Sequence, residues 1–311
     1  FFESLGVYTW YREPYFAPDY RELWALEQEL SDPGESKRQE LLSIWRLARD
    51  DGYAQWARGV GTQACQFTFF GLEENTDYFT RRKGAFQDNL FATERLLEVG
   101  IRPRWQLFLT KRSIPELEAF VDLIHRMQLD KRMQAAEQEF QVFVHLPCPD
   151  GEAVHLEYLR PSIDALHAIP SYLAEKTMIH FGKDSLEACL GKAEKDWLPE
   201  LLQDDGPHAE YYDPLAFMVT PGLDVYCNIA ELVPWWKLGN LKTDGVDRVL
   251  QRFQYNEVPG LHVNFQVPVS QLARMYGRNN SNLMYSRGDL IFWWMHKWGE
   301  EQWHAGGHSR F

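Results

Sequence analysis

Positive charge and long apolar stretches are both scarce in this sequence. The chain has 32 Lys and Arg residues against 45 Asp and Glu residues, a net charge of -13. Because nucleic-acid binding by counterion release needs a basic surface, we expect no nucleic-acid partner. The apolar run LIFWWM, Leu290 to Met295, is far shorter than the roughly 20 residues that span a bilayer, so we also expect no membrane insertion.

The sequence also lacks clustered cysteines. Its four cysteines lie far apart, at Cys65, Cys148, Cys189 and Cys227. This spacing matches neither a disulfide framework nor a local metal knuckle. The opening residues FFESLGVYTW have no basic region and no long apolar core of the kind a signal peptide has. These features predict a cytoplasmic protein with reduced thiols.

Two common catalytic signatures are missing as well. No Gly-x-Ser-x-Gly elbow occurs, so the sequence gives no support for a nucleophilic hydrolase. The segment RGVG at 58–61 lacks the third glycine of a dinucleotide fingerprint and is read as a turn. What the chain does have is 45% hydrophobic residues with 12 Trp, 14 Tyr and 19 Phe, which predicts a folded protein with an aromatic core.

Strand and helix patterns alternate through the first half of the chain. The expected strands are 5–10, 66–72, 103–109 and 141–147, and the expected helices are 18–30, 37–49, 85–99 and 115–127. The apolar run QFTFFGL at 66–72 indicates a strand covered on both faces. Gly100 suits a left-handed helix end. This alternation predicts an α/β fold with a parallel sheet, open or curled into a partial (β/α) barrel.

Two domains are expected. Residues 1–175 would form the barrel, and residues 176–311 a helical linker with a smaller α+β extension. Ligands of parallel sheets bind beyond the carboxyl ends of the strands. Glu13, the loop at 71–84, residues 110–112 and His145 would therefore lie on one rim.

The loop at 71–84 carries three consecutive cations, Arg81, Arg82 and Lys83, before Gly84. One hypothesis is an anion site, because the first N–H groups of the following helix attract a carboxylate or phosphate. The alternative is a surface loop whose cations pair with Glu73, Glu74 and Asp77.

Three regions of the chain carry ordered motifs. The first is the series Thr68, Gly71, Asp77, Arg81, Gly84, Phe86, Gly100 and Ile101. This series resembles the Ser-x-Asp-Gly, His-Asp-x-x-Arg and following glycine motifs of radical S-adenosylmethionine enzymes with a SPASM-like C-terminal extension. The family's Gly-Gly-Glu-Pro motif resembles YREP at 11–14, with Tyr11 and Arg12 at the glycine positions. Its Pro-Asp-Gly-Asp-Val-Tyr-Pro-Cys and Leu-Gly-Asn motifs resemble PGLDVYCN at 221–228 and LGN at 238–240.

The resemblance implies roles for three residues. Glu13 would accept hydrogen bonds from the methionine ammonium of S-adenosylmethionine, and Thr68 and Arg81 would hold its carboxylate. It also implies a [4Fe-4S] cluster bound by Cys-x-x-x-Cys-x-x-Cys, which this sequence lacks and which we expect upstream of Phe1. We expect no auxiliary cluster, because only Cys227 lies near a position that would serve one.

The function that follows is hydrogen abstraction by a 5′-deoxyadenosyl radical from an unknown small-molecule or peptide substrate, with a flavodoxin or ferredoxin as reductant. Without the cluster segment, the chain by itself would not turn over. A second hypothesis is a cluster-free barrel that acts as a binding or partner protein. A third is a metal-dependent barrel hydrolase, which would require a bound divalent metal.

Several histidines and tryptophans allow two interpretations. His145, near Cys148, is either a rim residue that transfers protons or a core histidine. The last histidines, His296, His304 and His308, either bind a metal or belong to a flexible surface tail. Six tryptophans indicate packing between the two domains or, less simply, a substrate groove: Trp235, Trp236, Trp293, Trp294, Trp298 and Trp303.

Overall fold

A computed structural model of the chain describes residues 18–29, 42–149, 151–208, 217–227 and 232–306. The chain divides into two compact units, and each is described by itself. Unit 1 comprises Phe1–His145 and Ile169–Gly182, and unit 2 comprises Leu146–Ala168 and Lys183–Phe311. The expected strand at 5–10 and Glu13 lie outside the described residues.

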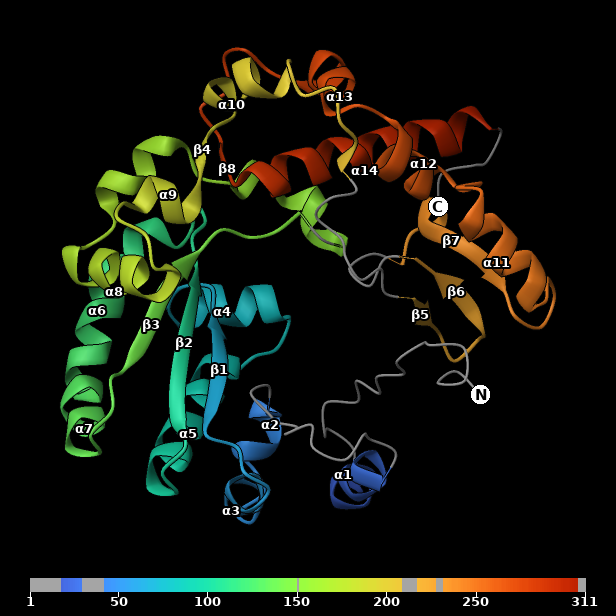
Figure 1. Ribbon diagram of the computed structural model, residues 1–311. Helices are drawn as coiled ribbons and strands as arrows, with labels where there is room; N and C mark the ends of the chain where they lie inside the picture. Colours follow the sequence, from blue (N-terminus) through green and yellow to red (C-terminus); the bar gives the residue numbers. More distant parts are fainter. Residues whose placement is uncertain (1–17, 30–41, 150, 209–216, 228–231, 307–311) are drawn as a thin grey trace. The chain divides into compact units, whose positions relative to one another are not determined.

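Unit 1 contains a three-stranded parallel sheet in the order β1-β2-β3, which Figure 1 shows as adjacent arrows. The parallel pairing confirms the α/β class. The strands are β1 (Ala64–Phe69), β2 (Arg102–Phe108) and β3 (Gln141–His145). Their register joins Thr68 to Gln106 and Gln106 to Phe143. Closure into a barrel is not seen in the described part of the unit.

Helices connect these strands and precede them. They are α1 (Tyr20–Glu29), α2 (Ile44–Leu47), α3 (Tyr53–Gly59), α4 (Glu73–Thr80), α5 (Ala85–Glu98), the 3-10 turn η2 (Ile114–Glu116), α6 (Leu117–Arg126), α7 (Leu129–Ala135) and α8 (Ser171–Phe181). The predictions of α1, α5 and α6 are confirmed, and Gly100 has the expected positive φ of 76°. Helix α4 was missed, because the segment 71–84 was read as one loop.

Side chains of the sheet alternate between two different faces. The apolar face carries Phe67, Phe69, Trp105 and Leu107, each with 0% exposure. Helices α5 and α6 cover this face, since the ring of Phe69 contacts those of Phe86 and Phe120. The expectation of a strand covered on both faces was therefore wrong for β1, whose other face is only half buried.

We call the second face the polar face, defined by Gln66, Thr68, Arg104, Gln106 and His145. All five side chains are half buried, and they occupy alternate positions in the register of the three strands. Helix α8 lies along β3: the hydroxyl of Thr177 accepts a 2.9 Å hydrogen bond from the backbone N–H of Val144. This contact satisfies a strand-edge donor that would otherwise need a further strand.

Unit 2 has a separate core. Its elements before the small sheet are η3 (Gly151–Leu159), η4 (Ile163–Ala168), α9 (Leu186–Leu190), β4 (Lys192–Ala193) and α10 (Glu194–Leu201). They are followed by β5 (Met218–Val219), β6 (Asp224–Tyr226), η6 (Pro234–Trp236), β7 (Lys237–Asn240), α11 (Val246–Gln254), α12 (Pro259–Gln266), α13 (Val269–Tyr276), β8 (Met284–Tyr285) and α14 (Arg287–Ala305). Strands β5, β6 and β7 form an antiparallel sheet, and β4 pairs with β8.

Helix α14 runs through the core of unit 2 and corrects two expectations. His296 and His304 belong to this helix rather than to a flexible tail, and His296 is only 5% exposed. His308 lies outside the described residues. Five tryptophans pack within the core of unit 2 itself: Trp235, Trp236, Trp293, Trp294 and Trp298. In the described ranges, no helix has both the length and the apolar character needed to cross a bilayer.

Candidate functional site

The segment after β1 contains helix α4, which is hydrogen-bonded to the start of α5, and is not an open cationic loop. The carboxylate of Asp77, in α4, accepts hydrogen bonds from the backbone N–H groups of Gly84 at 2.6 Å and Phe86 at 3.0 Å. These are N–H groups at the start of α5, where an external anion was expected to bind. The anion-site hypothesis for this helix end was therefore wrong, because the chain supplies the anion itself.

The three cations have separate surroundings. Arg82 forms an ion pair with Asp88, and Asp88 also pairs with Arg49 at 2.8 Å. Lys83 is exposed. Arg81 is exposed too, and it ends α4 in a left-handed conformation with a φ of 53°. For Arg82 the structure thus agrees with the surface-loop alternative in that the cation pairs with an acidic side chain. The partner is Asp88, and not Glu73, Glu74 or Asp77.

Gly71 makes the sharp exit from β1 possible. Its φ is 129°, and a Cβ atom there would lie 2.2 Å from the Glu116 carboxylate oxygen. The same carboxylate accepts a 2.7 Å hydrogen bond from the N–H of Leu72. Glu116 therefore occupies the space that the absent side chain leaves, and only glycine fits this turn.

Thr68 lies on the polar face, close to the carboxyl end of β1. Its carbonyl oxygen accepts a 2.9 Å hydrogen bond from the side-chain amide of Asn89 in α5. Asn89 is 6% exposed, so this bond fixes the end of β1 to the helix from the buried side. The side chain of Thr68 remains half buried on the opposite face.

The predicted site residues are not all brought together. No hydrogen bond or ion pair joins Thr68 to Arg81 within the described part of the chain, and the eight-residue helix α4 separates them along the sequence. The residue three positions after Asp77 is Thr80, whose hydroxyl donates to the carbonyl of Thr76 at 2.7 Å. Arg81 follows Asp77 by four positions, one more than in the His-Asp-x-x-Arg motif.

A line of amides on the polar face was missed in the sequence. The Nε of Arg104 donates to Oε1 of Gln66 at 3.1 Å, and Nε2 of Gln66 donates to Oε1 of Gln106 at 2.7 Å. The signal was available in principle, because Gln66 and Thr68 alternate with apolar residues along β1. The strong apolar character of QFTFFGL obscured that alternation.

Aromatic and imidazole rings border these amides. Phe108 stacks on Phe70 with ring centroids 5.2 Å apart and meets the ring of His145 edge-on at 5.7 Å. The ring of His180, from α8, is parallel to that of Phe143 at 3.7 Å. Burial, together with the nearby Arg104 and His145, lowers the pKa of His180, which favours the neutral imidazole.

Comparisons with known proteins give little information about this chain. No family model and no curated protein sequence matches the chain. A solved structure described as native anSMEcpe with bound AdoMet and the Cp18Cys peptide aligns over 93% of this chain and 81% of its own, with 9% identity and a TM-score of 0.46. Native anSMEcpe with bound AdoMet aligns over 84% and 72%, with 9% identity and a TM-score of 0.40. Both are structures of an anaerobic sulfatase-maturating radical SAM enzyme. At such low scores and identities, the function of this chain has to follow from its own residues.

The surroundings of the cysteines do not suit ligands of an iron-sulfur cluster. Cys65 and Cys227 are buried, and burial raises the pKa of the Cys227 thiol to about 12, which opposes the thiolate form that metals bind. Among the described residues, no three His, Cys, Asp or Glu side chains are grouped as a metal site would require. The described residues therefore do not fit the role of cluster ligands, whereas the donors of the polar face fit a carboxylate.

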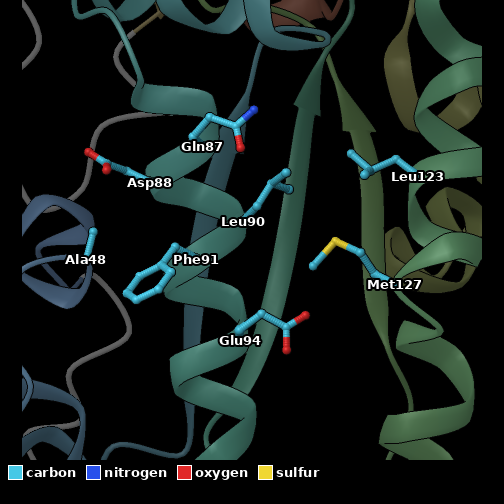
Figure 2. Close-up of a pocket in the computed structure, with 8 residues that line it drawn as sticks. All are labelled: Ala48, Gln87, Asp88, Leu90, Phe91, Glu94, Leu123 and Met127. Atoms are coloured by element: carbon cyan, nitrogen blue, oxygen red, sulfur yellow. The ribbon is translucent and has the colours of Figure 1, made fainter.

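A groove of about 500 Å³ lies on the helix side of unit 1. Figure 2 shows that Leu123 of α6 and Met127, which follows that helix, face Leu90 of α5 across it, with the acidic side chains of Asp88 and Glu94 along its length. Glu94 binds Arg132 through both oxygens, at 2.8 and 2.7 Å, and Asp88 is paired as described above. The groove is lined by helices that cover the apolar face, so it is separate from the polar face that carries Thr68.

Proposed function

We propose that this chain is the scaffold of a radical S-adenosylmethionine enzyme with a SPASM-like extension, and that its polar face binds S-adenosylmethionine. One observation carries the proposal: Gly71 and Asp77 of the motif set the path of the chain after β1, and Thr68 is left on the polar face. Gly71 turns the chain, Asp77 binds the start of α5, and the side chain of Thr68 remains half buried.

The residues of this chain would bind and orient the cofactor. Thr68 would donate to the methionine carboxylate from the end of β1, and Arg81 would add a guanidinium. Glu13, which lies outside the described residues, would accept from the ammonium group. The aromatic side chains beside Thr68 would exclude water from the bound ligand.

Cluster chemistry would depend on residues that these 311 positions do not contain. In the order of the family's motifs, Cys-x-x-x-Cys-x-x-Cys lies before the Gly-Gly-Glu region, so we place it upstream of Phe1. When bound, the reduced [4Fe-4S] cluster would supply the electron that cleaves S-adenosylmethionine to a 5′-deoxyadenosyl radical, which abstracts hydrogen from a small-molecule or peptide substrate. A flavodoxin or ferredoxin would serve as the reductant, in the cytoplasm.

The first test is the iron and acid-labile sulfide content of the full-length gene product, purified and reconstituted without oxygen. We expect about four of each per chain, as one [4Fe-4S] cluster requires. A gene product that begins at its natural start codon and holds neither iron nor sulfide after reconstitution would exclude the enzyme and favour a binding protein.

A second test separates the cations beside α4. Calorimetric titration with S-adenosylmethionine would compare the unmodified protein with Arg81→Gln and with Lys83→Gln, a matched change of an exposed cation two residues away. Loss of a charge-assisted hydrogen bond predicts an affinity about tenfold lower for Arg81→Gln and unchanged for Lys83→Gln. Equal affinity for the two variants would remove Arg81 from the site.

A further inference from the structure

The amide line consists of Arg104, Gln66 and Gln106, and Arg104 sets the direction of both of its hydrogen bonds. The guanidinium of Arg104 has only donors, so the side-chain group of Gln66 that faces it has to be the carbonyl oxygen. The amide nitrogen of Gln66 then points to Gln106, whose carbonyl oxygen accepts at 2.7 Å. As a result, the amide nitrogen of Gln106 points away from Gln66, with two N–H donors that have no acceptor among the described residues.

Thr68 lies beside this amide. Thr68 and Gln106 are direct partners in the register of β1 and β2, and neighbouring strands are separated by about 4.8 Å. Both side chains are half buried on the polar face. The Thr68 hydroxyl is a hydrogen-bond donor that can rotate towards an acceptor, and it likewise makes no hydrogen bond to the described residues. Two donors thus lie next to each other near the carboxyl ends of β1 and β2.

Negative side chains are absent from the strands around these donors. The sequences of β1, β2 and β3 are ACQFTF, RPRWQLF and QVFVH, with no Asp or Glu. This local composition contrasts with the net charge of -13 of the whole chain. Arg104 polarises the amide line through Gln66, which strengthens the donors at its far end. A ligand that satisfies them has to bring oxygen acceptors, and negative charge is favoured.

We infer that Gln106 and Thr68 together form a carboxylate-binding site, in which the Gln106 amide is oriented by Arg104 through Gln66. The inference rests on the proposed function for the identity of the ligand: the carboxylate is that of the methionine part of S-adenosylmethionine. Gln106 is then a binding residue, and Gln66 and Arg104 are positioning residues that act through it.

Affinity measurements with two ligands test the assignment. Calorimetry would compare S-adenosylmethionine with 5′-methylthioadenosine, which lacks the amino-acid part. We expect Gln106→Leu to weaken binding of S-adenosylmethionine about tenfold or more and to leave binding of 5′-methylthioadenosine unchanged. Gln106→Glu, which keeps the shape but brings a second carboxylate, should weaken it further. Gln87→Leu, an exposed glutamine on α5, is the matched control and should change neither affinity. Equal loss of affinity for both ligands would overturn the carboxylate assignment.

Gln66→Leu tests the positioning role, because it removes the bond that orients Gln106 while leaving Gln106 in place. We expect a loss smaller than that of Gln106→Leu, and almost no further loss when the two changes are combined. Independent, additive losses would contradict the shared orientation. Urea unfolding midpoints close to that of the unmodified protein would show that each variant is folded.

A titration with acetate separates this inference from the proposed function. The side-chain amide resonances of Gln106, assigned by their loss in Gln106→Leu, would be followed in a ¹H–¹⁵N spectrum of the unmodified protein. Saturable shifts with acetate, without any binding of S-adenosylmethionine, would retain the carboxylate site and reject the cofactor. Shifts with both ligands would support both. No shift with either would overturn the inference, as would binding of S-adenosylmethionine that leaves these resonances unmoved.

Discussion

The carboxylate of Asp77 accepts a 2.6 Å hydrogen bond from the backbone N–H of Gly84, and so one helix provides the N-terminal cap of the next. A second bond, from Phe86 at 3.0 Å, is made by the other oxygen. The pairing is charge-assisted and lies at the positive end of α5. It fixes the return of the chain from α4, and thereby the position of the loop that carries Arg81.

Replacement of this carboxylate should cost stability. For Asp77→Ala we expect the free energy of unfolding to fall by about 1–2 kcal/mol, in the range measured for lost N-terminal caps. Urea unfolding followed by circular dichroism would measure it. Asp122→Ala, an exposed aspartate on α6, is the control and should change stability by less than about 0.5 kcal/mol. Equal effects of the two changes would contradict the capping role.

Two glycines should respond in opposite directions to alanine. Gly71→Ala would place a Cβ 2.2 Å from Glu116 at a φ of 129°, and we expect a loss of about 1–3 kcal/mol in the free energy of unfolding. Gly59, at the end of α3, has no atom within 4 Å of an added Cβ and no positive φ. Gly59→Ala should therefore be neutral or stabilise by up to about 1 kcal/mol. The same unfolding assay would detect both, and a tolerated Gly71→Ala would contradict the turn geometry.

Local signals in the sequence predicted much of unit 1 but not the relations between its elements. The apolar runs gave β1, β2 and β3, and Gly100 marked the end of α5, because strand burial and helix ends depend on neighbouring residues. Helix α4 was missed because its polar sequence EENTDYFT has no apolar stripe and depends on Asp77 and Thr76 for its contacts. The amide line was missed because its three residues belong to two strands, and their register is a tertiary property.

In unit 2, too, the contacts between elements could not be predicted from local sequence signals. The tryptophans of α14 were predicted to pack between the two domains, whereas they lie in the core of unit 2. Trp235 packs against Gly299, where a Cβ would approach the indole to 2.5 Å. No local sequence pattern predicts this contact, because Trp235 and Gly299 are far apart in the chain. The tail interpretation of the histidines was wrong for His296 and His304, because both belong to α14.

A buried ion pair in unit 2 should be among its most sensitive features. Glu194 has 0% exposure and accepts from Nε of Arg278 at 2.7 Å and from the backbone N–H of Arg278 at 3.1 Å. Glu194→Gln keeps the shape but leaves the guanidinium with less opposing charge. We expect the free energy of unfolding to fall by about 3 kcal/mol. Glu200→Gln, at a carboxylate whose side chain is 56% exposed, is the control and should cost less than about 1 kcal/mol.

Stability should also depend on pH through His208. This histidine is 2% exposed, and burial, assisted by the nearby Arg287, lowers its pKa to about 4. An unfolded histidine has a pKa of about 6.5, so the unfolded chain binds the proton more tightly between these values. Protonation therefore favours unfolding: the contribution of His208 is fully present above about pH 6.5 and is lost as the pH falls towards 4.

Urea unfolding between pH 7.5 and 4.5 would reveal this contribution as a decrease in the free energy of unfolding of about 2–3 kcal/mol. His208→Gln lacks the titrating group and should show a correspondingly smaller decrease, even if its stability at pH 7.5 is lower. His167→Gln, an exposed histidine in η4, should retain the decrease of the unmodified protein. If His208→Gln and His167→Gln had the same pH dependence, a buried neutral His208 would be contradicted, because burial is the property that separates the two residues.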